Sequence, residues 1–230
     1  SGTISGDIFI DENASSATIV NWAGGTLDGD VYLYSGTLDV EGGRIIGDVL
    51  GDGSSTVNFT GDFVTEGSFQ ADKISIDSGV TLTLADDLTG AVSNAGTLYV
   101  SLINEEPPVP DDWVFAKEVL DKDESAPRAP TDGWLGNKRG TILGNYRQEA
   151  SGSLKIDLAS EESYSQLFVT GSASFASNAK IEVNVIGAPK LSIGSTINGI
   201  VSVEMDEMPE SAEKSEDAKT VQKRTLEHIG

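Results

Sequence analysis

Residues 143–203 read LGNYRQEASGSLKIDLASEESYSQLFVTGSASFASNAKIEVNVIGAPKLSIGSTINGIVSV, and here the order of residues is more informative than the composition. Apolar and polar residues alternate within it, as Leu-Lys-Ile-Asp-Leu in 154–158 and Ile-Glu-Val-Asn-Val in 181–185. A period of two places one set of side chains on a buried face and the other in water. The pattern predicts short half-buried strands, with Asp157 facing the solvent.

Glycines separate these strands. They are Gly152, Gly171, Gly187 and Gly194. Turns between strands often need a positive φ, which glycine adopts without steric cost. We therefore expect four turns at these positions.

An imperfect repeat runs through residues 1–104. Its units read SGTISGDI, GGTLDGDV and GGRIIGDV, followed by a shortened TGDF. The aspartates of the four units are Asp7, Asp30, Asp48 and Asp62, separated by 23, 18 and 14 residues. Irregular steps near twenty are typical of a solenoid with one coil per repeat, because insertions enter at the turns. The fold class predicted is all-β, a right-handed parallel β-helix.

An antiparallel sandwich would show similar short strands. Hairpin dipeptides are scarce, however, and Asn-Gly occurs only at Asn198. The parallel arrangement is therefore preferred, with residues 1–104 as its coils.

Two further segments break the pattern. Residues 105–140 are acidic and rich in proline, and we expect an excursion that packs on the solenoid. Residues 204–230 are highly charged, which predicts a tail that is either a short helix or disordered.

The net charge of −22 excludes whole classes of partner. Such a surface repels phosphates and anionic lipids, so we expect no nucleic-acid partner and no membrane insertion of this segment. The chain has no cysteine, hence no disulfide framework and no thiolate metal site.

Candidate sites for metals are weak. The Gly-Asp positions of the repeat would suit a file of calcium ions if they were regular, but the nine-residue calcium repeat is absent. We expect these aspartates to cap local backbone N–H groups at turns. No cofactor and no metal site is predicted.

Candidate catalytic and sugar-binding residues are equally sparse. His228, the single histidine, lies in the charged tail, which does not favour a catalytic triad. With 37 acids, close carboxylate pairs arise by chance and do not indicate a glycosidase. Sugar stacking would need aromatic rings, and the tryptophans, Trp22, Trp113 and Trp134, are far apart. The chain is predicted not to be an enzyme.

Three motifs follow one another in the C-terminal stretch. They are Gly-x-Tyr-x-Gln at 144–148, Gly-x-Leu-x-Ile at 152–156 and Tyr-x-x-Leu-x-Val-x-Gly-x-Ala at 164–173. This order resembles the C-terminal passenger segment, or autochaperone region, of bacterial autotransporters. Residues 144–203 are covered by the resemblance. The turn at 176–179 departs from the family pattern, which often has Gly-Gly where this chain has Ala-Ser-Asn-Ala.

The resemblance implies a structural function. The C-terminal coils would leave the outer-membrane pore first, fold, and template the stacking of the coils before them. The family's partner is its own outer-membrane β-barrel, which this chain lacks, and the location would be the bacterial cell surface or the medium after outer-membrane translocation. Residues 141–203 would form a β-sandwich-like cap rich in hairpins.

The same resemblance assigns the folding core to the residues that match the motifs. These residues are Gly144, Tyr146, Gln148, Leu154, Ile156, Tyr164, Leu167, Val169 and Gly171.

Two other functions stay open on the sequence. The flat rows of polar side chains on stacked coils would suit an adhesin that binds a host glycan or protein, or self-association of the chain. The third candidate is a polysaccharide-cleaving β-helix, which by family resemblance would need a basic residue near acidic calcium ligands. Only Arg44 and Lys73 are basic in the first hundred residues.

Overall fold

Short parallel strands make up the described chain. The structure is a computed structural model, and it describes residues 2–11, 19–102, 139–187, 191–192, 194 and 196–204. The strands have between two and eight residues. Among the described residues there is no helix, and so none long and apolar enough to cross a membrane. The all-β class predicted from the sequence is confirmed.

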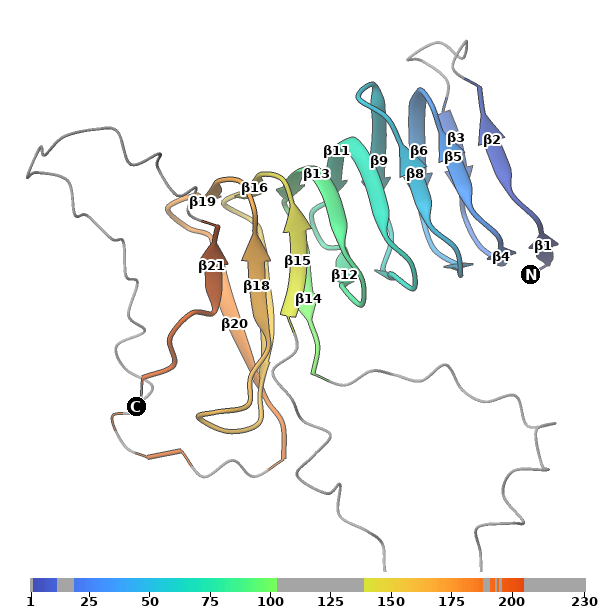
Figure 1. The fold of residues 1–230 in the computed structure, drawn as a ribbon. Helices are drawn as coiled ribbons and strands as arrows, with labels where there is room; N and C mark the ends of the chain where they lie inside the picture. The colour runs from blue at the N-terminus through green and yellow to red at the C-terminus, as the bar shows by residue number, and fades with distance from the viewer. Residues whose placement is uncertain are drawn as a thin grey trace, which may run out of the picture.

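The strands stack in layers along one axis (Figure 1). Each complete layer holds three successive strand segments. Each segment pairs with its counterpart in the next layer, except that Arg44–Ile45 and Phe63–Val64 do not pair, which divides one row into two sheets. We call the three resulting rows A, B and C, and number the layers 1 to 8 from the N-terminus. Row A consists of β1 (Thr3–Ser5), β4 (Thr26–Asp28), β7 (Arg44–Ile45), β10 (Phe63–Val64), β12 (Thr81–Thr83), β14 (Thr97–Val100), β17 (Ser153–Leu158) and β20 (Lys180–Val185).

Rows B and C form one 13-stranded sheet, because β11 and β13 belong to both rows. Row B consists of β2 (Ile8–Ile10), β5 (Val31–Leu33), β8 (Val49–Gly51), the first parts of β11 (Phe69–Ile76) and β13 (Leu88–Asn94), β15 (Arg139–Leu143), β18 (Gln166–Val169) and β21 (Val201–Val203). Row C consists of β3 (Ile19–Trp22), β6 (Gly36–Val40), β9 (Ser55–Phe59), the last parts of β11 and β13, β16 (Tyr146–Gln148) and β19 (Ala173–Phe175).

Register shows how long each layer is. In layers 1 to 5 paired residues lie 17 to 23 positions apart, as in the pair Val31 and Val49 and the pair Ile8 and Val31. Between layers 5 and 6 the step grows to 54 in rows B and C, as between Leu88 and Ile142, whereas in row A it stays at 16 there and reaches 56 between layers 6 and 7. The extra residues lie between β14 and β15, so a long insertion enters at a turn and leaves the stack in register.

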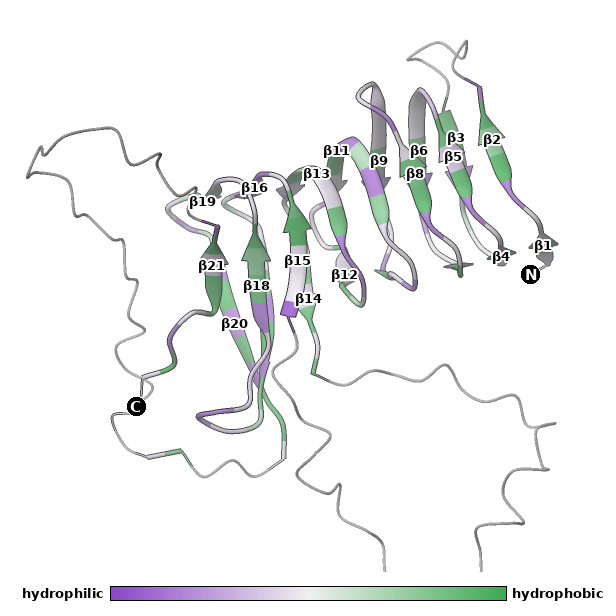
Figure 2. Ribbon diagram, viewed as in Figure 1, coloured by the Kyte–Doolittle hydropathy of each residue, from purple (hydrophilic) through white to green (hydrophobic). Residues whose placement is uncertain are grey.

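The core lies inside the stack, between the three rows. Apolar side chains at equivalent positions form ladders, such as Leu82, Leu98 and Leu154 in row A, all with no exposed surface. Figure 2 shows hydrophobic positions recurring from strand to strand along the stack. Stacking like residues at a spacing of about 4.8 Å buries each one against its counterparts above and below.

The C-terminal layers correct one prediction. We expected residues 141–203 to form a sandwich-like cap of hairpins, but β15 to β21 pair in parallel with layers 5 to 8. The single antiparallel contact is an isolated bridge between Leu158 and Tyr164, among the described residues. The alternating pattern specifies a strand with one buried face, and does not distinguish a hairpin from a parallel layer.

The glycines of this stretch behave differently from one another. Gly187 and Gly194 have φ values of 70° and 88°, as predicted for turns. Gly152 and Gly171 are not in this positive-φ region; a Cβ on Gly152 would meet the carbonyl oxygen of Asn94 in the neighbouring strand. Glycine is needed there for close approach of backbones and not for its φ angle.

Several predictions lie outside the described residues. They concern most of the excursion at 105–140, including Trp113 and Trp134, and the charged tail at 205–230 with His228.

Candidate functional site

In layers 1 to 3 an aspartate stands directly before each row B strand, and these aspartates form a ladder along the stack. The carboxylate oxygen Oδ1 of Asp7 accepts a hydrogen bond from the N–H of Asp30 at 2.9 Å, and Oδ1 of Asp30 accepts one from Asp48, also at 2.9 Å. Asp48 in turn accepts hydrogen bonds from the N–H (2.8 Å) and the hydroxyl (3.0 Å) of Ser68. These aspartates do cap backbone N–H groups, as predicted, but the groups are not local ones: they lie 18 to 23 residues further on, in the next layer. In the described part of the chain no three potential metal ligands come together.

The fourth repeat position was predicted wrongly. Ser68, not Asp62, is the next member of the ladder, and Asp62 accepts a hydrogen bond from the N–H of Thr81 at a different turn. Asp62 follows Asp48 by 14 residues, which is too short for one layer of 17 to 23 residues. The Gly-Asp pair at Asp62 therefore belongs to the sequence repeat, but it does not occupy the ladder position in the stack.

Removal of one member of this ladder should weaken the stack measurably. The Asp48→Ala change leaves the half-buried N–H of Ser68 without its acceptor, so we expect a loss of about 1 kcal/mol in the free energy of unfolding. Urea denaturation followed by circular dichroism measures this loss. The Asp77→Ala change is the control, since that side chain is exposed in a turn and should change stability little. Equal effects of the two changes would contradict a capping role.

A buried polar cluster, which we call the tyrosine cluster, joins layers 5 to 8 at the corner between rows C and A. It consists of Asn94, Tyr146 and Gln148. The Asn94 amide donates to the Tyr146 hydroxyl (3.0 Å) and to the carbonyl of Ser153 (2.9 Å). The Tyr146 hydroxyl donates to Gln148 Oε1 at 3.0 Å. Gln148 Nε2 donates to the carbonyls of Gly152 (2.9 Å) and Lys180 (2.6 Å), the second of which belongs to the next layer.

Burial governs the chemistry of the tyrosine cluster. All three side chains are essentially inaccessible to solvent. Burial raises the pKa of the Tyr146 phenol well above its ordinary value, so the group stays neutral and acts as a hydrogen-bonding bridge. Asn94 Oδ1 has no donor among the described residues. The cluster therefore connects layers and offers no reactive group.

The Tyr146→Phe change tests this bridge. It removes the hydroxyl and leaves the Asn94 amide and Gln148 Oε1 with one partner fewer, at an expected cost of about 2 kcal/mol in stability. The Tyr164→Phe change is a matched control, because the Tyr164 hydroxyl lies in an exposed hydrogen bond to the carbonyl of Asn198 (2.7 Å). We expect thermal melting to fall clearly for the first variant and by less for the second. The opposite order would exclude the tyrosine cluster as a stabilising element.

A second buried cluster surrounds Asp157 in β17, and we call it the aspartate cluster. Its Oδ1 accepts hydrogen bonds from the Tyr99 hydroxyl (2.8 Å) and the Asn184 amide (2.7 Å). Its Oδ2 accepts from the Ser101 hydroxyl (3.0 Å) and the Leu102 N–H (2.8 Å). Four donors from layers 6 and 8 thus converge on one carboxylate in layer 7.

The aspartate cluster corrects the prediction that Asp157 faces water. Its side chain does point away from the core, on the same side of β17 as Lys155, but it is completely buried. The chain leaving β14 at Ser101 and Leu102 passes over it and excludes solvent. The sequence alone does not give the strand register that pairs Tyr99 with Lys155 and Asp157 with Asn184. Without that register the aspartate cluster cannot be predicted.

Tyr164, a residue of the motif, lies near this cluster. It follows the turn at 159–163, forms the isolated bridge with Leu158, and reaches the carbonyl of Asn198. The neighbouring Ser165 hydroxyl accepts from the N–H of Asp157 at 2.8 Å. Tyr164 thereby connects the end of β17, at Leu158, with the segment after β20, at Asn198.

The remaining motif residues are either buried core side chains or glycines at close contacts between layers. Leu154, Ile156, Leu167 and Val169 are all fully buried in the core of layer 7. Gly144 has a φ of 147°, and a Cβ on it would collide with the carbonyl oxygen of Gly90 in the layer before. A Cβ on Gly171 would meet Asn145 Oδ1 at 2.5 Å. The motif residues thus lie in layers 6 and 7, but they do not converge on one surface site.

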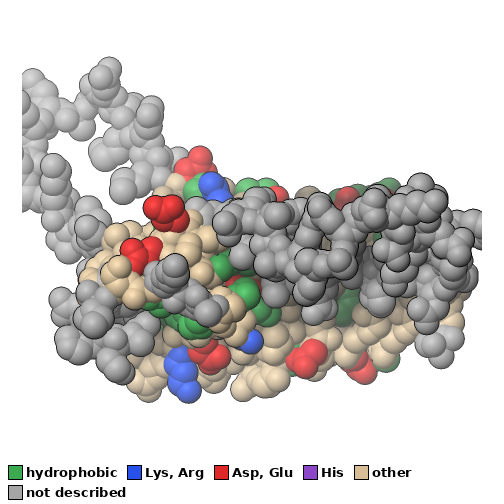
Figure 3. Space-filling view, turned by 90° about the horizontal axis from the view of Figure 1, so that it is seen from below, with side chains coloured by type: hydrophobic (Ala, Val, Ile, Leu, Met, Phe, Trp, Pro, Cys, Tyr) green, Lys and Arg blue, Asp and Glu red, His purple; other side chains and the backbone are tan. Residues whose placement is uncertain are grey.

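Charged side chains on the described surface are spread out. Figure 3 shows acidic groups at several separate places on the lower face of the stack. Arg44 pairs with Glu66 at 2.5 Å and Arg147 with Glu149 at 2.8 Å. Of the tryptophans only Trp22 is described, and it packs half-buried against the core.

No family model, no curated protein and no solved structure matches this chain. The functional argument therefore depends on the residues and their geometry.

Proposed function

We propose that the chain is a right-handed parallel β-helix from the C-terminal part of an autotransporter passenger, and that its last layers fold first and template the others during export. On this proposal the chain is not an enzyme, and it acts at the bacterial surface. The ordered motifs of residues 144–173 support the family, and the stacked parallel rows are consistent with the fold.

The observation that supports the folding role is that layers 5 to 8 have more buried polar contacts and longer strand pairing than layer 1. Layers 5 to 8 contain both buried clusters and the longest ladder of row A, six residue pairs between β17 and β20. Layer 1 has strands of three or four residues, and it exposes Phe9 (64%), Ile19 (60%) and Ile4 (49%).

Such an asymmetry has a kinetic consequence. In a stack each layer contacts only its neighbours, so stability is close to a sum of layer and interface contributions. Folding then nucleates where these contributions are largest and propagates outward. In this chain that place is the C-terminal half, layers 5 to 8, although the last layer exposes Val185 (53%) and Val203 (42%) much as layer 1 exposes its apolar residues. In an autotransporter this half is the first part to reach the cell exterior.

Native-state hydrogen exchange on the whole chain tests the proposal. We expect the highest protection in β14 to β20 and a decline toward β1 to β3. A companion chain lacking residues 141–230 should fail to form a protease-resistant core. If residues 1–104 fold equally well alone, the templating role is excluded and a role in adhesion becomes the leading candidate.

A further inference from the structure

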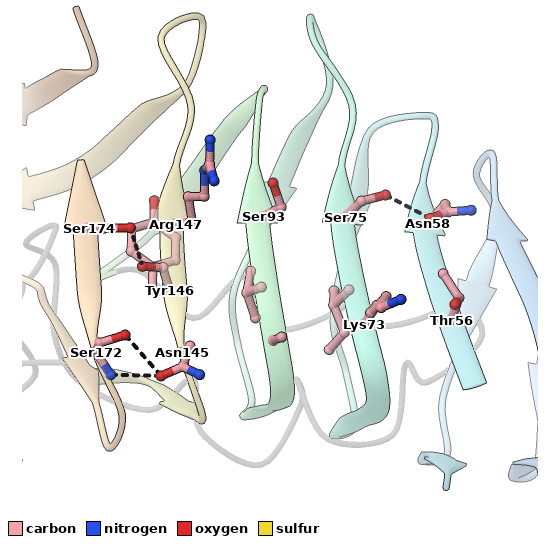
Figure 4. A pocket seen from close by; sticks show the side chains of 13 residues that line it. Thr56, Asn58, Lys73, Ser75, Ser93, Asn145, Tyr146, Arg147, Ser172 and Ser174 are labelled. Atoms are coloured by element: carbon pink, nitrogen blue, oxygen red, sulfur yellow. Dashed lines mark hydrogen bonds between the residues drawn. The ribbon is translucent and has the colours of Figure 1, made fainter. Parts of the chain in front are cut away.

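The outer face of row C carries a groove that the folding role does not use. It runs across β9, β11, β13, β16 and β19 and has a volume of about 500 Å³. Figure 4 shows the side chains along it, which come from five successive layers. The groove therefore lies along the axis of the stack and suits an elongated ligand.

Small side chains make the floor of the groove. Ala91 and Ser93 occupy its centre. Ser75 lies beside Ser93 on one side, and Arg147 and then Ser174 follow on the other. Its strands are all paired with neighbours on both sides except β19, so an extended peptide finds no free backbone edge at the centre. The groove offers hydroxyl and amide groups on strands spaced by about 4.8 Å, interrupted by Arg147. The Ser75 hydroxyl donates to Asn58 and the Ser93 hydroxyl to Glu149, so these oxygens are available to a ligand as acceptors. These groups match a ligand with regularly repeated hydroxyl groups.

One cation in the groove is uncommitted. Most other basic side chains of the described chain have partners: Arg44 pairs with Glu66, Arg147 pairs with Glu149, Lys155 lies 4.5 Å from the centre of the Tyr99 ring, and Arg139 covers Phe168. Lys180 is exposed like Lys73, but it lies outside the groove. Lys73 is exposed and has no carboxylate within ion-pair distance among the described residues, not even the adjacent Asp72. Its register neighbours on this face, Thr56 and Ala91, are uncharged.

We propose that this groove binds a carboxylated polysaccharide, with its sugar hydroxyls on the serine-lined floor and one carboxylate on Lys73. Arg147 lies two strands from Lys73, about 10 Å along the axis, and its ion pair with Glu149 leaves it 70% exposed for a second carboxylate. A nucleic acid or another polyanion with a charge on every unit does not fit, because the net charge of −22 repels it at long range. The ligand must therefore carry its carboxylates sparsely among neutral sugars. The proposal is independent of the folding role.

Titration calorimetry of the whole chain tests this site. The probe is a hyaluronan oligosaccharide, in which only every second sugar carries a carboxylate, and the control ligand is the same oligomer with its carboxylates fully methyl-esterified. We expect binding of the acid form that weakens as salt is raised, with little binding of the ester. The Lys73→Gln change should reduce affinity roughly five- to tenfold, the effect of one charge-assisted hydrogen bond at an exposed site.

Two further variants make the result specific. Lys180→Gln removes the same charge from β20, on row A and outside the groove, and should leave affinity unchanged. Ala91→Trp fills the floor of the groove and should abolish binding, with the melting temperature retained because Ala91 is exposed. No binding of the acid oligomer, equal losses in the two lysine variants, or unchanged affinity in Ala91→Trp would each overturn the proposal.

Discussion

Replacing Asp157 by leucine is expected to destabilise the protein by about 3 kcal/mol and to release the chain that follows β14. The carboxylate satisfies four donors, and the backbone N–H of Leu102 is a donor that no side-chain change can remove. A buried donor left without an acceptor costs about 1–3 kcal/mol. Relief of the desolvated charge offsets part of the sum of these costs.

Two measurements together identify this effect. Urea denaturation gives the loss of stability, and hydrogen exchange at the Leu102 amide reports directly on its bond to Oδ2. The Asp157→Asn variant keeps the shape and one acceptor oxygen, so we expect an intermediate loss. Asp72→Ala, at an exposed carboxylate, is the control with an expected change within 0.5 kcal/mol. If Leu102 stays protected in Asp157→Leu, the carboxylate does not hold this segment.

The Leu167→Asp, Val169→Asp double variant is expected to lose the C-terminal layers altogether. Both side chains are fully buried in β18, between β15 and β21. Two carboxyl groups in an apolar core must either stay charged without partners or become neutral at a cost, and both remove several kcal/mol. The sum is comparable with the whole stability of a domain, about 5–15 kcal/mol.

This variant also tests the proposed export function. We expect loss of cooperative melting and of protease resistance in residues 139–204, together with reduced surface display of an attached passenger. The matched control introduces two carboxylates at exposed positions, Thr196→Asp with Ser202→Asp, and should melt and display normally. Unchanged melting and display in the double variant would remove the autochaperone assignment.

Local sequence determined the strand content and the direction of most side chains. Alternation in residues 154–158 specified Leu154 and Ile156 as buried, and the structure agrees. The Gly-Asp repeat located three turns correctly, although the N–H groups that their aspartates cap lie 18 to 23 residues away, in the next layer. The strands and turns depend on neighbours within a few residues, so they are readable from a single sequence.

Tertiary structure decided the features that join distant residues. The parallel course of β17 and β20, the place of Ser68 in the aspartate ladder, and the burial of Asp157 beneath Ser101 and Leu102 all follow from register. Ser101 and Asp157 are separated by 56 residues, and the 103–138 segment lies between them. Alternation says which side of a strand a residue occupies, but only the stacked layers determine what covers that side.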